Sequence, residues 1–226
     1  RPSTASSDEF ELSVWEEVVT SDGALAFDIP QDWTVRELPA ESNDHDDSTG
    51  VTLEVVNAEG RTMGMLSSGL IHGQAMFPQH PFYEFEYEEL PGLENTEPDH
   101  REDPAFVYQA LEMPGGFQAM LGLTNYGSSA GTTELSVMPQ GFSFVEGAGG
   151  GFFSLFIKPE EMLPGSSLDE YSTLESYRET AEYADIKRMM MSLRFAAPDT
   201  SPGSTPSPTE ATYGESAFPW PESEWQ

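Results

Sequence analysis

Residues 127–131, Gly-Ser-Ser-Ala-Gly, match the G-x-S-x-G pattern that surrounds the nucleophile of many serine hydrolases. In those enzymes a helix begins directly after the serine, where it aims the hydroxyl and helps to form the oxyanion hole. Here Thr132, Thr133 and residues 135–138 are typical of a strand. We therefore interpret residues 127–131 as a hairpin loop, and a serine hydrolase that uses Ser129 is the alternative.

The histidines support neither that alternative nor a metal centre. They are His45, His72, His80 and His100. All four precede Ser129, whereas the histidine of an enzyme with this serine motif follows the serine. The spacing of His72 and His80 fits no zinc pattern, and the chain has no cysteine to complete one. The sequence therefore predicts no catalytic residue, no metal centre and no cofactor.

An acidic segment is the best candidate for weak cation binding. Asp44, Asp46 and Asp47 cluster carboxylates, which are the ligands that hard cations prefer. The register of an EF-hand fails, because the sixth residue from Asp44 is Thr49 and the twelfth is Val55. We interpret the segment as a solvent-exposed loop, with a weak cation site at the three aspartates as the alternative.

Charge and composition exclude several classes of partner. The 226 residues include nine Lys and Arg against 40 Asp and Glu, for a net charge of -31. Such a field repels the phosphates of nucleic acids and anionic lipid surfaces. No apolar run approaches the roughly 20 residues of a membrane-spanning helix, so no transmembrane segment is predicted. With no cysteine, the chain forms no disulfide.

Composition divides the chain into three parts. Residues 1–12 are predicted to be a flexible polar leader, and residues 13–197 a single α+β domain. Residues 198–226 form an acidic tail rich in Ser, Thr and Pro, which lacks the apolar periodicity of a folded segment. Aromatic side chains in such a tail are typical anchors for a partner or for the chain's own domain. The predicted partner-binding residues are Phe218, Trp220 and Trp225.

Within the domain, short apolar runs separated by turns predict antiparallel strands. The clearest is residues 83–88, where a period of two places Tyr83, Phe85 and Tyr87 on one face and three glutamates on the other. Further strands are expected at residues 15–19, 24–29, 51–56, 63–66, 106–113, 117–125, 135–138, 142–145 and 152–157, with turns at 21–23, 57–60 and 114–116.

The pattern becomes helical towards the end of the domain. Residues 172–175, Ser-Thr-Leu-Glu, match a capping box and predict a helix start there. Tyr183, Ile186 and Met190 then recur at helical spacing, and Arg194-Phe195 is expected to leave the helix as a short strand. Strands first and a helix last favour an α+β fold with an antiparallel sheet and a C-terminal helix packed on it.

Two segments resemble PsbP-like domains. Residues 26–35, AFDIPQDWTV, are similar to the F-x-(I/L)-P-x-x-W entry of that superfamily. Residues 186–195, IKRMMMSLRF, resemble its terminal helix and S-L-R-F strand. The resemblance extends over about residues 15–195, and it implies an antiparallel sheet flanked by helices and an extracytoplasmic, non-enzymatic role.

The chain is also similar to small actinobacterial lipoproteins of the LpqN/LpqT kind, which have this fold behind a Ser/Thr-rich leader. The sequence begins with Arg1 instead of an initiator methionine, so we expect a processed chain. It contains no cysteine to carry a lipid, so a lipid anchor would belong to the precursor only.

These inferences together predict a binding or scaffolding module of the extracellular space or the cell envelope. Its ligand would be a protein or an apolar molecule, bound in a groove between the sheet and the terminal helix or by the aromatic residues of the tail. The alternatives are the serine hydrolase and a purely structural acidic surface protein.

Overall fold

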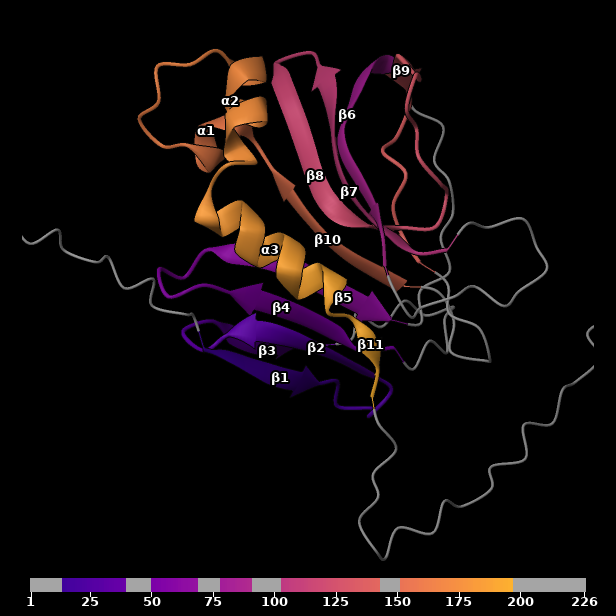
Figure 1. The fold of residues 1–226 in the computed structure, drawn as a ribbon, viewed down its shortest axis with the longest axis vertical. Helices are drawn as coiled ribbons and strands as arrows, with labels where there is room; N and C mark the ends of the chain where they lie inside the picture. The colour runs from indigo at the N-terminus through magenta and orange to yellow at the C-terminus, as the bar shows by residue number, and fades with distance from the viewer. Residues whose placement is uncertain (1–13, 40–49, 69–77, 91–102, 143–150, 197–226) are drawn as a thin grey trace, which may run out of the picture. The chain divides into compact units, whose positions relative to one another are not determined.

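Two antiparallel β-sheets and three helices make up the part of the chain that the computed structural model describes, which is residues 14–39, 50–68, 78–90, 103–142 and 151–196 (Figure 1). Contacts divide the chain into two units, residues 1–196 and 197–226, and all described residues belong to the first. The strands are β1 (Trp15–Val19), β2 (Leu25–Pro30), β3 (Thr34–Leu38), β4 (Thr52–Val56), β5 (Thr62–Ser68), β6 (His80–Glu89), β7 (Ala105–Met113), β8 (Gly116–Thr124), β9 (Glu134–Leu135), β10 (Gly151–Ile157) and β11 (Arg194–Phe195). The helices are α1 (Pro159–Met162), α2 (Glu170–Tyr177) and α3 (Ala181–Met191).

The strand order explains how the end of the chain returns to its beginning. The larger sheet has the order β3-β4-β5-β10-β8-β7-β6-β9, and the smaller one the order β1-β2-β11. Every pair of named strands is antiparallel. The predicted α+β class, with antiparallel strands and a C-terminal helix, is confirmed. Strand β11 is also where the sequence indicated it, paired with β2.

The helices pack on one face of the larger sheet, which we call the inner face (Figure 1). Helix α3 buries Tyr183, Ile186, Met189 and Met190 there, as its apolar periodicity predicts. The packing is tight at Gly64 of β5, because a Cβ at that position would lie 2.9 Å from Cε of Met189 and the end of that flexible side chain would have to shift. Burial of these side chains is the main source of stability for the helix.

Two local predictions about this face were wrong. Helix α2 begins earlier than the Ser172 capping box indicated, because the Asp169 carboxylate accepts a hydrogen bond from the Ser172 amide at 2.9 Å and caps the helix. In β6, a bulge between Glu84 and Glu86 shifts the register against β7. Tyr87 therefore does not share a face with Phe85, because it packs in a cluster on the opposite side of the sheet.

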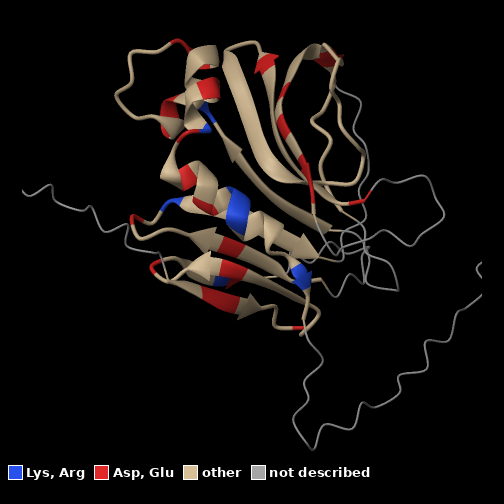
Figure 2. Ribbon diagram, viewed as in Figure 1, with Lys and Arg blue, Asp and Glu red and all other residues tan. Residues whose placement is uncertain are grey.

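The same bulge turns the Glu86 side chain towards α3. Its carboxylate accepts hydrogen bonds from the Tyr183 hydroxyl and from Nζ of Lys187, and Nε of Arg178 lies 3.8 Å away. Burial of the Glu86 carboxyl raises its pKa, but the hydrogen bonds from Lys187 and Tyr183 lower it by more, so the pKa lies below its ordinary value. Lys187 also bridges to Glu88. Basic residues are thus concentrated where α3 meets the sheets (Figure 2).

We expect Glu86→Gln to lower the free energy of unfolding at pH 7 by about 1–2 kcal/mol, because hydrogen bonds to a charged group contribute about 1.5–3 kcal/mol and solvent screens this partly exposed carboxylate. The native pKa is below the unfolded value of 4.5, so the carboxylate stabilises the fold above pH 4.5. That contribution is lost as the pH falls through the native pKa. Urea unfolding at several pH values should show wild type and variant converging in acid. Glu89→Gln, at an exposed position of the same strand, is the control; a gap as wide at pH 3 as at pH 7 would contradict the assignment.

Candidate functional site

The face of the larger sheet away from α3, which we call the outer face, carries apolar side chains of its own. Strand β10 shows the division, because alternate residues point to opposite faces. Phe153 and Leu155 belong to the core beneath the helices, whereas Phe152 and Phe156 lie on the outer face. The sheet is therefore apolar on both sides along this strand.

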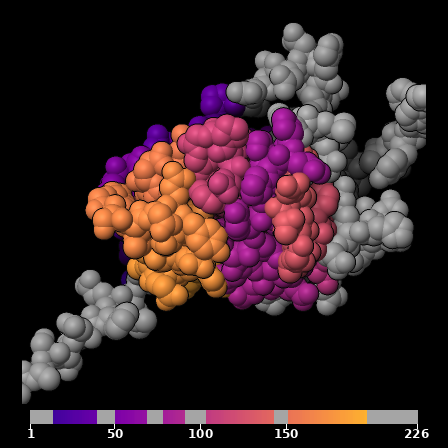
Figure 3. Space-filling model, turned by 90° about the horizontal axis from the view of Figure 1, so that it is seen from above, coloured from indigo at the N-terminus to yellow at the C-terminus, as the bar shows by residue number. Residues whose placement is uncertain are grey.

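Part of the outer face is covered by the segment that follows β8. Its residue Met138 packs with Phe82, Val107, Leu111 and Met120 in a small second core. Figure 3 shows this segment and the helices on opposite sides of β6. Among the described residues this second core includes none from β10 or β5, and the covering segment reaches β10 only at Phe156.

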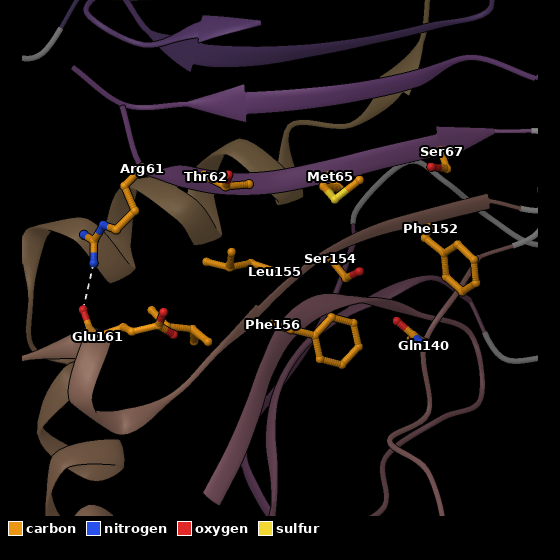
Figure 4. Close-up of a pocket in the computed structure, with 11 residues that line it drawn as sticks. Arg61, Thr62, Met65, Ser67, Gln140, Phe152, Ser154, Leu155, Phe156 and Glu161 are labelled. Carbon is orange, nitrogen blue, oxygen red and sulfur yellow. Dashed lines mark hydrogen bonds between the residues drawn. The ribbon is translucent and has the colours of Figure 1, made fainter. Parts of the chain in front are cut away.

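A hollow of about 480 Å³ lies on the outer face, between β5, β10 and the start of α1 (Figure 4). A second hollow of about 290 Å³ continues it beneath the covering segment. Gln140 and Phe156 line both hollows, so we treat them as one site, called the trench. The first hollow is lined by Arg61, Thr62, Met65, Ser67, Gln140, Phe152, Ser154, Leu155, Phe156, Ile157 and Glu161. The second is lined by Pro78, His80, Leu111, Met113, Gln118, Ser136, Val137, Met138, Gln140 and Phe156.

Large apolar side chains on the trench floor are left open to solvent. Phe156 is 48% exposed, Met113 43%, Met65 41% and Val137 39%. These are four of the ten large hydrophobic residues exposed in the described part of the chain, and they gather at one site. An exposed apolar surface that is concentrated in this way is characteristic of a binding site.

The first hollow is lined by β5 and β10, and these two strands separate as they run along it (Figure 4). The ladder between β5 and β10 pairs Phe152 with Ser67 and ends where Ser154 pairs with Met65. Gly151 exchanges both main-chain hydrogen bonds with Phe142, on the β8 side. In an antiparallel strand, the main-chain N–H and C=O of successive residues point alternately to the two neighbouring strands. Those of Gly151 point to the β8 side, so those of Phe156, five residues later, point towards β5, beyond the end of that ladder.

The polar lining of the trench is mainly uncharged, and its titratable members are Arg61, Glu161 and His80. Arg61, at one end, is held by the main-chain oxygen of Glu161, 2.8 Å away, and by an ion pair with Glu182 (Figure 4). Most other polar groups are uncharged hydroxyls and amides. The described part of the chain also contains no group of three or more His, Asp or Glu residues placed to hold a metal ion.

The predicted groove between the sheet and the terminal helix is not where the open surface lies. Tyr183, Ile186, Met189 and Met190 fill that interface and are almost fully buried. The apolar residues of α3 are core residues, whereas the exposed apolar side chains of the trench are on the other face of the sheet, so binding in the predicted groove stays a prediction. A signal was present in the sequence of β10, GFFSLFI, where apolar residues occupy both faces instead of alternating with polar ones.

The other predicted site residues lie outside the described residues. These are Asp44, Asp46 and Asp47, the weak cation-site candidates, and Phe218, Trp220 and Trp225, the partner-binding candidates. Both assignments stay predictions.

The structure gives the serine motif a structural role. The Glu84 carboxylate accepts hydrogen bonds from the Ser128 hydroxyl at 2.5 Å and from the Ser129 amide at 2.8 Å, and so ties the loop to β6. A turn at Ala130 and Gly131 follows Ser129, where the nucleophile motif needs a helix. His80, the one histidine among the described residues, forms no hydrogen bond with the Ser129 hydroxyl.

Comparisons with known proteins do not add a relative. Neither the protein families, nor the curated proteins, nor the solved structures contain a match to this chain. Among the described residues, no helix is long and apolar enough to cross a membrane.

We expect a fluorophosphonate probe, which labels activated serines covalently, to leave Ser129 unmodified, because the loop lacks the helix that forms a nucleophile elbow. Mass spectrometry of the peptide that contains residues 127–131 provides the measurement, with Ser129→Ala as the blank. Stoichiometric labelling that disappears in that variant would establish the hydrolase alternative.

Proposed function

We propose that this protein is a non-enzymatic, extracytoplasmic binding module of PsbP-like fold, and that the trench on the outer face holds an apolar part of its ligand. The observation that carries the binding site is the grouping of Phe156, Met65, Met113 and Val137, half-exposed side chains that line one trench. Ligand sites in proteins are concave and mainly apolar, with a few polar groups that orient the ligand, and the trench has this character.

The PsbP-like assignment rests on sequence segments that have defined positions in the fold. The F-x-(I/L)-P-x-x-W segment runs through β2 into the turn at Trp33, which is buried. The S-L-R-F segment ends α3 and forms β11, which pairs with β2. The two segments that carry the resemblance are thus neighbours in the smaller sheet. The extracytoplasmic location follows from the same resemblance.

Binding in the trench can be tested with N-phenyl-1-naphthylamine, an uncharged apolar dye whose fluorescence rises when it leaves water. Phe156→Thr and Met65→Thr remove apolar surface from the floor while keeping residues that favour strands. We expect each to weaken dye binding about tenfold, which corresponds to about 1.4 kcal/mol.

Val19→Thr is the matched control, because Val19 is an equally exposed strand residue of the smaller sheet. Thermal unfolding of each variant verifies the fold. Equal dye affinity in wild type, Phe156→Thr and Met65→Thr would rule out the trench as the apolar site.

The alternative of a purely structural, salt-adapted protein makes a different prediction about salt. In the folded domain, Lys187, Arg194 and Arg61 already pair with carboxylates across elements. We therefore expect removal of salt to lower the melting temperature through repulsion among the excess carboxylates, while the domain stays folded at 25 °C. Circular dichroism during dialysis measures this, and complete unfolding without salt would favour the structural alternative.

A further inference from the structure

We propose that the ligand of the trench is an extended segment of a basic partner protein, held by its apolar side chains and by main-chain pairing with β10. This inference rests on the proposed function and names the class of ligand. Three independent properties of the site lead to it: its openness, the early end of the β5–β10 ladder and the charge of the protein.

The openness of the trench argues for a ligand that lies across the surface. Phe156 and Met65 form part of its floor and are still 48% and 41% exposed. A small molecule that was enclosed on all sides would need walls to cover it, since drug-sized ligands bury most of their surface in their pockets. A peptide segment can instead lie in the opening between β10 and β5, next to β10, with its other side exposed to solvent (Figure 4).

The separation of β5 and β10 supplies groups that recognise an extended main chain. Phe156 directs its N–H and C=O towards β5 after the ladder has ended at Ser154 and Met65. Strand addition uses the main-chain groups of a sheet edge for affinity and side-chain contacts for specificity. Strand β10 lies between β5 and β8, but beyond Ser154 it no longer pairs with β5 and presents a short edge of this kind. Gln140, which also lines the trench next to Phe156, supplies a further amide donor and acceptor (Figure 4).

Charge complementarity selects the sign of the partner. The net charge of -31 belongs to the whole chain, and at long range it attracts a basic segment and repels a second copy of this chain, an anionic lipid and an acidic peptide. Within the trench, Arg61 does not reverse this preference, because Glu182 pairs with it. The ligand is therefore expected to alternate apolar residues, which face the floor, with lysine or arginine residues, which face solvent.

A nine-residue fluorescent peptide of alternating lysine and leucine tests the inference by fluorescence anisotropy with the full chain. We expect binding that weakens at least tenfold in Phe156→Thr and in Met65→Thr but is unchanged in Val19→Thr. We expect the affinity to fall as salt rises from 50 to 500 mM.

Three altered peptides separate the contributions. Replacing lysine by glutamate should abolish binding, and replacing leucine by serine should weaken it at least tenfold. Methylating alternate main-chain nitrogens should also weaken it, because the peptide could no longer pair with β10.

Equal binding of the lysine–serine peptide, or equal affinity in wild type and Phe156→Thr, would show adsorption to the acidic surface and overturn the inference. Unchanged affinity of the methylated peptide would overturn the main-chain pairing. If the dye binds in a Phe156-dependent manner and the lysine–leucine peptide does not, the inference fails while the proposed function stands. If neither depends on Phe156, both fail.

Discussion

The packing of α3 against the inner face of the larger sheet is the contact on which the rest of the structure depends. It buries the apolar side of the only long helix in the described residues, and it joins that helix to β6 through Glu86, Tyr183 and Lys187. It also connects the two sheets, because Arg188 of α3 stacks on Trp15 at 3.9 Å, and the chain continues from α3 into β11. The scarce basic residues of a very acidic chain are used largely at this junction.

The helices fill the inner face of the larger sheet, and the proposed ligand site lies on the outer face. The outer face has its own small core beneath the segment after β8, but that core stops before β10 and β5. In the part of the chain that the structure describes, the trench is where apolar side chains of the outer face stay exposed. Its polar groups are mainly uncharged, and the serine motif, which is not among the residues that line the trench, fastens a loop to Glu84.

The sequence was most informative where a local pattern decides local structure. Turn residues such as Pro114 and Gly115 placed the β7–β8 hairpin, and helical spacing placed the buried side of α3. The sequence was misleading where pairing between strands far apart in the chain determines the structure. The bulge in β6 results from register with β7 and moved Tyr87 to the opposite face. The trench arises because β5 and β10, far apart in sequence, separate after a few pairs, and no window of the sequence reports that.

The central claim, that the ligand site is on the outer face and not under α3, can be tested by the methyl signals of methionine. Met65 and Met113 line the trench, whereas Met189 and Met190 are buried beneath α3. In a protein labelled with ¹³C at the methionine methyl groups, adding N-phenyl-1-naphthylamine should shift the Met65 and Met113 signals and leave those of Met189 and Met190 in place. Shifts confined to Met189 and Met190 would place the site under the helix and contradict the account.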